Sequence, residues 1–191
     1  DMALTANELA REAGVHTSTI NEHLSILEDV GLVRTLPQGR FKYFKLKSDD
    51  AALQLEALVA HSAPFTLSRV RPGPKDEALR ECRHCYKHIA GRLGVRLYRS
   101  LLAQEYIIPD DVEPKLTKAG RVFFQSLGMD IQALETGSKA LCRSCLDWSE
   151  RRFHLSGGVG EALMELMLRN GWLEAGEARR VLVLTDHGRE K

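Results

Sequence analysis

The stretch from Thr5 to Leu46 constrains the fold of this chain more than any other segment. Residues 6–13 predict a short amphipathic helix, and a tight turn at Gly14-Val15 leads into a second helix predicted over residues 17–30. Apolar residues recur on one face of each helix at the spacing of a buried stripe. These inward positions are Leu9, Ala10, Ile20, Leu24 and Leu27. Two short helices joined by a glycine turn predict a helix-turn-helix.

The segment that follows the second helix alternates between apolar and polar residues. Val33 to Leu46 has this period-2 pattern, and Pro37-Gln38-Gly39 interrupts it. Alternation on both sides of a proline and glycine turn predicts a β-hairpin. Helix, turn, helix and hairpin is the order of a winged helix-turn-helix, whose second helix lies in the DNA major groove.

The same segment resembles the DNA-binding half of the ArsR/SmtB family of bacterial repressors. The matching motifs are Gly14-Val15, His23-Leu24, Leu27-Glu28, Gly31-Leu32-Val33 and Gly39-Arg40 with Tyr43. The resemblance implies a homodimer on double-stranded operator DNA. It also implies that the helix after the wing, residues 51–60, packs against the partner through Leu55, Leu58 and Val59, although the periodicity fits an intramolecular core helix equally well. Family members have one or two helices before this motif, so we expect this chain to be N-terminally truncated.

The polar face of the second helix carries the candidate base-reading residues. Hydroxyl and amide groups at a helix N-terminus can bond phosphates or base edges, Asn can pair with adenine, and Glu can accept from cytosine. The candidates on this helix are Thr17, Ser18, Thr19, Asn21, Glu22 and His23. An alternative for the first three is a helix cap.

The predicted wing is rich in basic residues and has no acidic residue among them. Its cations are Arg34, Arg40, Lys42, Lys45 and Lys47, of which Arg34, Arg40 and Lys42 are our candidate DNA contacts. Such a strip suits phosphate contacts. A run of charge is more often only a solvated face, so the order of all these features together, rather than any one of them, favours DNA binding.

Composition excludes several classes of protein. The formal net charge is +1, so any nucleic-acid surface must be local rather than global. No run of 18 apolar residues predicts a membrane span, and the N-terminus has no secretory signal pattern. We therefore expect a cytoplasmic location, where four cysteines are typical of thiols, metal ligands or a redox switch rather than structural disulfides.

Pro64, Pro72, Gly73 and Pro74 mark a linker. We predict a winged helix-turn-helix over residues 1–62, a linker over 63–74 and a C-terminal effector domain over 75–191. The predicted fold is mainly α with small β wings, of the α+β class.

The C-terminal region contains an internal repeat. The segment His88 to Leu97 aligns with His154 to Leu163, and Leu116 to Arg121 aligns with Leu184 to Arg189. Each copy predicts a helix through its HxxGxxGxxL segment, a connection and an LTxxGR element. We interpret the two copies as degenerate winged-helix-like repeats.

Two CxxC pairs precede the two copies, and we expect the first pair to lie on a helix. The candidate metal or redox residues are Cys82, Cys85, His88, Cys142 and Cys145. Two CxxC pairs can form a four-thiolate site for zinc or another thiophilic metal, with His88 or His154 as a further ligand. A thiol redox sensor and buried, unreactive cysteines remain alternatives. Trp148 and His154 are candidates for a ligand pocket, with a core tryptophan as the alternative.

The C-terminal region resembles the effector half of a longer ArsR-type subgroup. The matching residues are Cys85, Tyr86, His88, Ala90, Gly91, Leu93, Gly94, Cys145 and Asp147 to Arg152. The metal sites usual in the ArsR/SmtB family have no counterpart in this chain. We therefore predict a transcriptional repressor, not an enzyme, whose operator binding responds to a ligand, metal or thiol oxidation. The alternative is a metal-binding or redox-active protein or enzyme with an appended DNA-binding-like domain.

Overall fold

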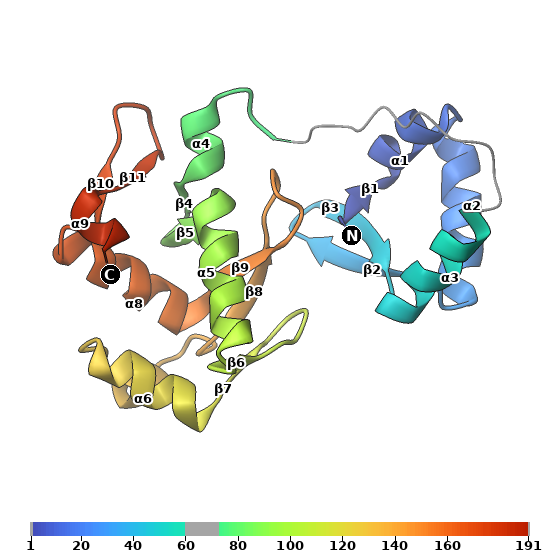
Figure 1. Ribbon diagram of the computed structural model, residues 1–191. Coiled ribbons are helices and arrows are strands. Elements are labelled where there is room, and N and C mark those ends of the chain that lie inside the picture. The colour runs from blue at the N-terminus through green and yellow to red at the C-terminus, as the bar shows by residue number, and fades with distance from the viewer. Residues whose placement is uncertain (1, 60–72, 191) are drawn as a thin grey trace. The chain divides into compact units, whose positions relative to one another are not determined.

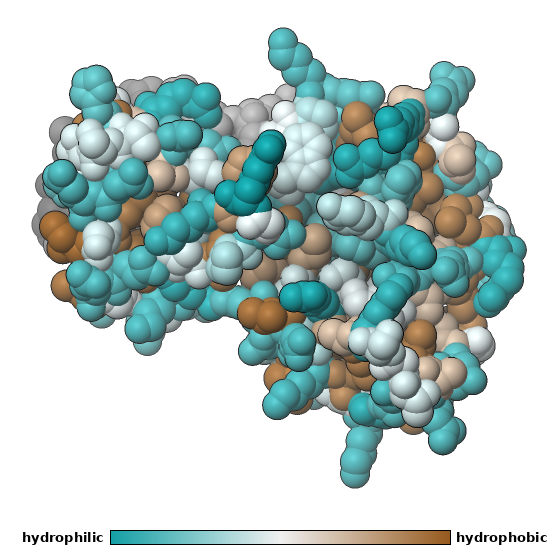
Figure 2. All heavy atoms as spheres, turned by 180° about the vertical axis from the view of Figure 1, so that it is seen from behind, coloured by the Kyte–Doolittle hydropathy of each residue, from teal (hydrophilic) through white to brown (hydrophobic). Residues whose placement is uncertain are grey.

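The computed structural model describes residues 2–59 and 73–190. The chain divides into two compact units, Asp1–Arg71 and Pro72–Lys191. Figure 1 draws the elements of both units. Hydrophilic side chains cover most of the face seen in Figure 2, with hydrophobic residues visible between them. The predicted linker, residues 63–74, lies almost entirely outside the described residues.

The first unit opens with the predicted pair of helices. Helix α1 (Ala6–Ala13) begins at a capping box, in which Thr5 accepts from the backbone N–H of Glu8 and the Glu8 carboxylate accepts from the backbone N–H of Thr5. It ends at Gly14, whose φ of 67° is the left-handed conformation that glycine adopts without strain. Helix α2 (Thr17–Asp29) follows after a short turn, one residue shorter than predicted.

A three-stranded sheet completes this unit. Strand β1 (Leu4–Thr5) pairs with β3 (Phe41–Leu46), which pairs with β2 (Val33–Gln38) in an antiparallel hairpin closed by Gly39-Arg40. Helix α3 (Asp49–Val59) follows the wing. Among the residues of this unit that the structure describes, the buried hydrophobic ones are Ala3, Ala10, Leu24, Leu36, Tyr43, Phe44 and Ala51. The predicted order of helix, turn, helix and hairpin is observed.

The second unit runs through one order of elements twice. After α4 (Glu77–Glu81), the first half contains the hairpin β4 (Arg83–Cys85) and β5 (His88–Ala90), helix α5 (Gly91–Ala103), the hairpin β6 (Ile107–Ile108) and β7 (Lys115–Leu116), and α6 (Lys118–Ser126). Helix α7 (Ile131–Thr136) leads to the second half. That half contains the hairpin β8 (Arg143–Leu146) and β9 (Phe153–Ser156), helix α8 (Gly157–Arg169), the hairpin β10 (Leu173–Ala175) and β11 (Leu182–Leu184), and α9 (Asp186–Arg189).

The two halves cross-pack. Helix α5 of the first half packs on β9 of the second, α8 of the second half packs on β5 of the first, and β5 contacts β9. Figure 1 shows α5 beside the β8–β9 hairpin. A single hydrophobic core, which includes Leu93, Phe124, Leu155, Val159 and Leu166, draws residues from both halves. The fold is therefore mixed α and β, with more strand than the predicted helical region.

Two local predictions were wrong. The first CxxC pair does not lie on a helix, because α4 ends at Glu81 and Cys82 already has the extended φ of −151°. The HxxGxxGxxL segments are not helical from their histidines, because His88 and His154 lie on strands. The helices start at Gly91 and Gly157, whose φ angles of 80° and 81° make the sharp strand-to-helix turn.

Candidate metal centre and nucleic-acid interface

Four metal-ligating side chains of the second unit converge between its two main hairpins. They are Cys85, His88, Cys145 and His154, and one ligand atom from each lies within 4.8 Å of the others. In the β-sheet register Cys85 pairs with His88 and Cys145 pairs with His154. Each hairpin therefore contributes one cross-strand Cys–His pair, because directly opposite residues project from the same face.

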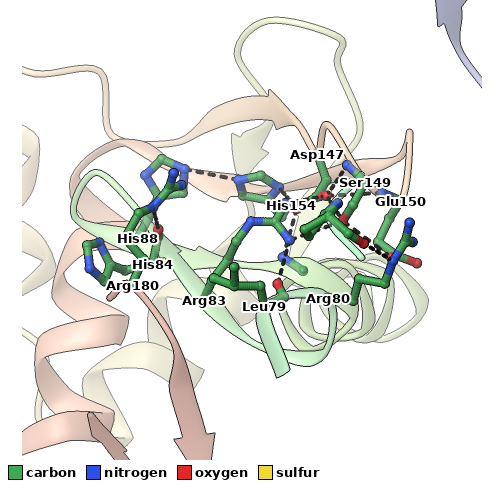
Figure 3. Close-up of polar contacts among 12 residues, drawn as sticks. Leu79, Arg80, Arg83, His84, His88, Asp147, Ser149, Glu150, His154 and Arg180 are labelled. Carbon is green, nitrogen blue, oxygen red and sulfur yellow. Dashed lines mark hydrogen bonds and ion pairs between the residues drawn. The ribbon is translucent and has the colours of Figure 1, made fainter. Parts of the chain in front are cut away.

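The two histidines face each other edge to edge. The Nε2 atoms of His88 and His154 are 3.1 Å apart, and Figure 3 shows the rings pointing toward one another. Both residues are buried, with exposed fractions of 7% and 1%. Two Nε2 atoms at this distance can share one proton, or both can offer lone pairs to a common ion.

Asp147 lies on the opposite edge of the His154 ring. Its Oδ2 is 3.4 Å from His154 Nδ1, although Nδ1 makes no hydrogen bond in this structure. Burial raises the pKa of Asp147, but the charges of Arg83 and His154 and the N–H groups of Gly91 and Glu150 outweigh burial and lower it. The result is a buried carboxylate beside the imidazole of His154, with ring and carboxylate both visible in Figure 3.

The cysteines divide into two chemically different pairs. Burial raises the pKa of Cys82 and of Cys142 to about 12, and both thiols are part of the hydrophobic core. Hydrogen bonding from Cys145 lowers the pKa of Cys85, and His154 and His88 add to this effect, although burial opposes it. The structure therefore does not assemble the four-cysteine group that spacing suggested. Cys82 and Cys142 lie apart from the ligand cluster, and His154 belongs to it.

The Trp148 side chain lies beside the buried Arg83–Asp147 ion pair. Its ring stacks under the guanidinium of Arg83, with the Arg83 Cζ 4.9 Å from the ring centroid, and the residue is 38% exposed. Arg83 donates to Asp147 Oδ1 at 2.7 Å. Trp148 thus covers the ion pair that supports His154.

Helix α2 presents its polar residues to solvent in the first unit. Ser18, Asn21, Glu22 and His23 are exposed, whereas Leu24 on the opposite face is buried. The remaining two candidates are more constrained. Thr17 donates to Asn7 Oδ1 at 3.1 Å, and Thr19 is half-buried. Ser18, Asn21 and Glu22 therefore share one helix face, whereas His23 is exposed on another side of the helix.

The wing places its cations unequally. Arg40 lies at the exposed turn, with its Cζ 5.1 Å above the Phe41 ring. Lys42 is exposed, and its Nζ is 3.7 Å from Glu28 Oε2 of α2. Arg34 is half-buried, and it lies opposite Lys45 in the β2–β3 register, away from the turn. Arg40 and Lys42 are thus better placed for phosphate contacts than Arg34.

Comparison with known proteins bears on this helix-hairpin arrangement. A family model described as a helix-turn-helix domain matches residues 2–35. The HTH-type transcriptional regulator YdfF of Bacillus subtilis is 32% identical over 184 residues, which cover 96% of this chain and 81% of YdfF. The chain belongs to the HTH-type transcriptional regulators. No solved structure matches it.

Beyond its DNA-binding domain, this regulator has an apolar pocket that sequence reasoning missed. The pocket has a volume of about 570 Å³ and lies between α5, α6 and α8, lined by residues such as Leu97, Tyr106, Phe123, Leu163 and Trp172. These residues are spread over both halves of the unit, so no local pattern predicts their meeting. None of the described helices has the length and the apolar composition that a membrane span requires.

Proposed function

We propose that the regulator is a sequence-specific, ArsR/SmtB-type repressor that binds a pseudo-palindromic operator as a homodimer. The supporting observation is the exposed polar face of α2, with Asn21, Glu22 and His23 accessible, beside a hairpin that ends in Arg40. In this arrangement α2 enters the major groove and the wing contacts the backbone. Half-sites lie about one helical turn apart, so sites selected from a random DNA pool should be palindromic.

Operator binding is modulated through the second unit in this proposal. That unit contains a cluster of metal-ligating and thiol side chains, and its two halves share one core. An effector that favours one arrangement of the unit shifts the population between DNA-competent and incompetent dimers. The proposed function is binding rather than catalysis.

The two halves of the second unit are, we infer, two copies of a degenerate winged-helix-like module. Both copies have the order hairpin, helix, hairpin and helix. Thr117 caps the last helix of the first copy by accepting from Gly120 N at 3.0 Å, and Thr185 accepts from Gly188 N at 3.0 Å in the second. A duplication of this kind places equivalent surfaces of the two copies opposite each other, and one regulatory ligand can bind to both.

The variants Thr19→Ala and Asn21→Ala test base reading. A bidentate contact between a side chain and a base contributes about 1–3 kcal/mol of discrimination. Asn21→Ala should therefore reduce the difference in binding free energy between the selected site and a mismatched site by that amount. Thr19→Ala should act in the same direction but less, because Thr19 is half-buried. Titration of each variant against the selected site and single-base mismatches measures the change. Unchanged discrimination in both variants would remove α2 from the recognition role.

The double variant Arg40→Ala and Lys42→Ala tests the phosphate contacts. Each lost contact reduces the slope of log K against log salt by about 1, so we expect a slope shallower by about 2 and weaker binding to every sequence alike. The double variant Lys87→Ala and Lys118→Ala removes the same charge from exposed positions of the second unit and should leave the slope unchanged. Equal slopes for the wing variant and this control would contradict wing contact with DNA.

A further inference from the structure

We propose that Cys85, His88, Cys145 and His154 bind one zinc-type divalent ion, which joins the two halves of the second unit. Only the idea that this ion regulates operator binding rests on the function proposed above. The metal site itself is tested without DNA, so the two can fail separately.

The spacing of the four side chains fits a tetrahedral ion. With Zn–N and Zn–S distances of about 2.05 and 2.3 Å, a tetrahedral site places two nitrogen ligands about 3.3 Å apart and two sulfur ligands about 3.8 Å apart. The Nε2 atoms of His88 and His154 are 3.1 Å apart, and all four ligand atoms lie within 4.8 Å of one another. Adjustments of an ångström or less therefore complete the coordination shell.

The chemistry of these donors selects the kind of ion. Two thiol sulfurs and two imidazole nitrogens suit zinc and other thiophilic ions, whereas magnesium and calcium require oxygen ligands. Both cysteines ligate as thiolates, so binding of the ion releases their protons. Four protein ligands leave no open position for a substrate, so this is a closed site of the structural class.

The surroundings of His154 are those of a prepared ligand. A metal-bound imidazole usually has a carboxylate or carbonyl at its second nitrogen, which fixes the ring and its tautomer. Asp147 Oδ2 is 3.4 Å from Nδ1 of His154, and Asp147 is held by Arg83 and by the backbone N–H of Gly91 at 2.7 Å. With Nε2 on the ion, Nδ1 carries the proton and is left free to donate to Asp147.

The position of the cluster explains what the ion would do. Cys85 and His88 belong to the first half of the unit, and Cys145 and His154 belong to the second. One ion therefore cross-links the β4–β5 and β8–β9 hairpins at the point where β5 contacts β9. Because the unfolded chain does not present this arrangement of ligands, free energy of metal binding becomes free energy of folding for the unit.

The experiment uses the full chain, stripped of metal with a chelator under reductant and titrated with Co²⁺ and then Zn²⁺. We expect one ion per chain, the intense visible bands of tetrahedral Co²⁺, and thiolate charge-transfer absorption in the near ultraviolet. Zn²⁺ at 1,000 times its dissociation constant should raise the Tm of the unit by roughly 10 °C or more. Both tryptophans, Trp148 and Trp172, lie in this unit, so their fluorescence follows its unfolding.

Matched variants assign the ligands. Cys85→Ser and Cys145→Ser should each lose stoichiometric Co²⁺ binding or at least half of the charge-transfer intensity. Cys142→Ser, in the core, and His84→Ala, beside the site, should keep one ion with the wild-type spectrum. Circular dichroism establishes that each variant is folded, and chelation of the wild-type chain gives a test that needs no variant.

Three results would overturn the proposal. The first is less than half an ion per wild-type chain at saturating Co²⁺. The second is a wild-type spectrum in the Cys85→Ser and Cys145→Ser double variant. The third is a Cys85–Cys145 disulfide, found by mass mapping of alkylated thiols, that persists under the reductant and prevents metal binding. Loss of DNA binding with an intact metal site would count only against the proposed operator function.

Discussion

Replacement of Arg83 by methionine is expected to lower the free energy of unfolding of the second unit by about 3–5 kcal/mol. Arg83 and Asp147 both have exposed fractions of 0%, and their closest N···O distance is 2.7 Å. Removal of the guanidinium leaves the Asp147 carboxylate buried without its cation. The guanidinium also donates to Leu79 O and to Ser149 Oγ, so those two acceptors lose a donor as well.

A matched control separates burial from the loss of an arginine. Arg96→Met removes the same group from the same unit, but the side chain of Arg96 is 58% exposed and its partner Glu81 is 45% exposed. Exposed pairs contribute about 0.2–1 kcal/mol, so this variant should remain close to wild type. Urea unfolding followed by tryptophan fluorescence, in metal-free protein, measures both variants without a contribution from bound ions.

The double variant Arg83→Met and Asp147→Asn completes the test. Replacing both charges removes the uncompensated carboxylate, so the double variant should be more stable than the sum of the single changes predicts. Two results would mean that the pair is solvated and that Asp147 is not fixed by Arg83. One is additive changes in the free energy of unfolding, and the other is a loss of stability for Arg83→Met as small as that for Arg96→Met. The role of Asp147 as the orienting group for His154 would then lack support.

Local signals in the sequence were sufficient for the helix-turn-helix and the hairpin of the first unit, but not for strand β1, which pairs with the distant β3. The helix over residues 6–13 was predicted with the observed bounds, because its apolar periodicity and the glycine after it are both local features. The hairpin was predicted from the alternation on both sides of Gly39. Its two strands are neighbours in the chain, so their pairing is also a local feature. Such elements need no knowledge of distant contacts.

The ligand cluster could not be read from the same kind of signal. CxxC spacing brings two thiols together on a helix, but residues three apart on extended backbone point to opposite faces. Cys82 therefore points into the core while Cys85 faces the other hairpin, and Cys142 and Cys145 repeat this division. The repeat contained a usable signal for the histidines, since it aligns His88 with His154, but the same offset aligns Cys85 with Arg151 rather than with Cys145. No local pattern indicated that β5 of the first copy contacts β9 of the second.

Close packing of each long helix on the strand before it depends on one glycine, and Gly160→Ala is the variant that tests this for α8. A Cβ at position 160 would lie 2.6 Å from the backbone oxygen of Leu155 and 3.6 Å from the Cβ of His88. Because a backbone atom cannot turn aside as a side chain can, α8 must move away from the strands it packs on. Overpacking of this kind costs about 1–3 kcal/mol.

Gly158→Ala is the control from the same helix. A Cβ at position 158 would have its nearest neighbour, Leu134 Cδ2, at 3.6 Å, an ordinary contact distance. This variant should be neutral or more stable by about 0.4–1 kcal/mol, because alanine restricts the unfolded chain. Urea unfolding of both variants measures the difference, which should be about 1–4 kcal/mol in favour of Gly158→Ala.

The same substitution also links packing to the ligand cluster. Gly94 of α5 is the counterpart of Gly160, since its Cβ would lie 2.5 Å from the backbone oxygen of Ile89 and 3.3 Å from the Cβ of His154. A Cβ on either helix would therefore clash with the strand before it, and a Cβ at position 94 would also crowd the histidine of the other half. If the halves are held in this register, Gly160→Ala should weaken Co²⁺ binding while Gly158→Ala leaves it unchanged. Equal Co²⁺ affinity and equal stability for the two variants would show that α8 does not fix the position of His88.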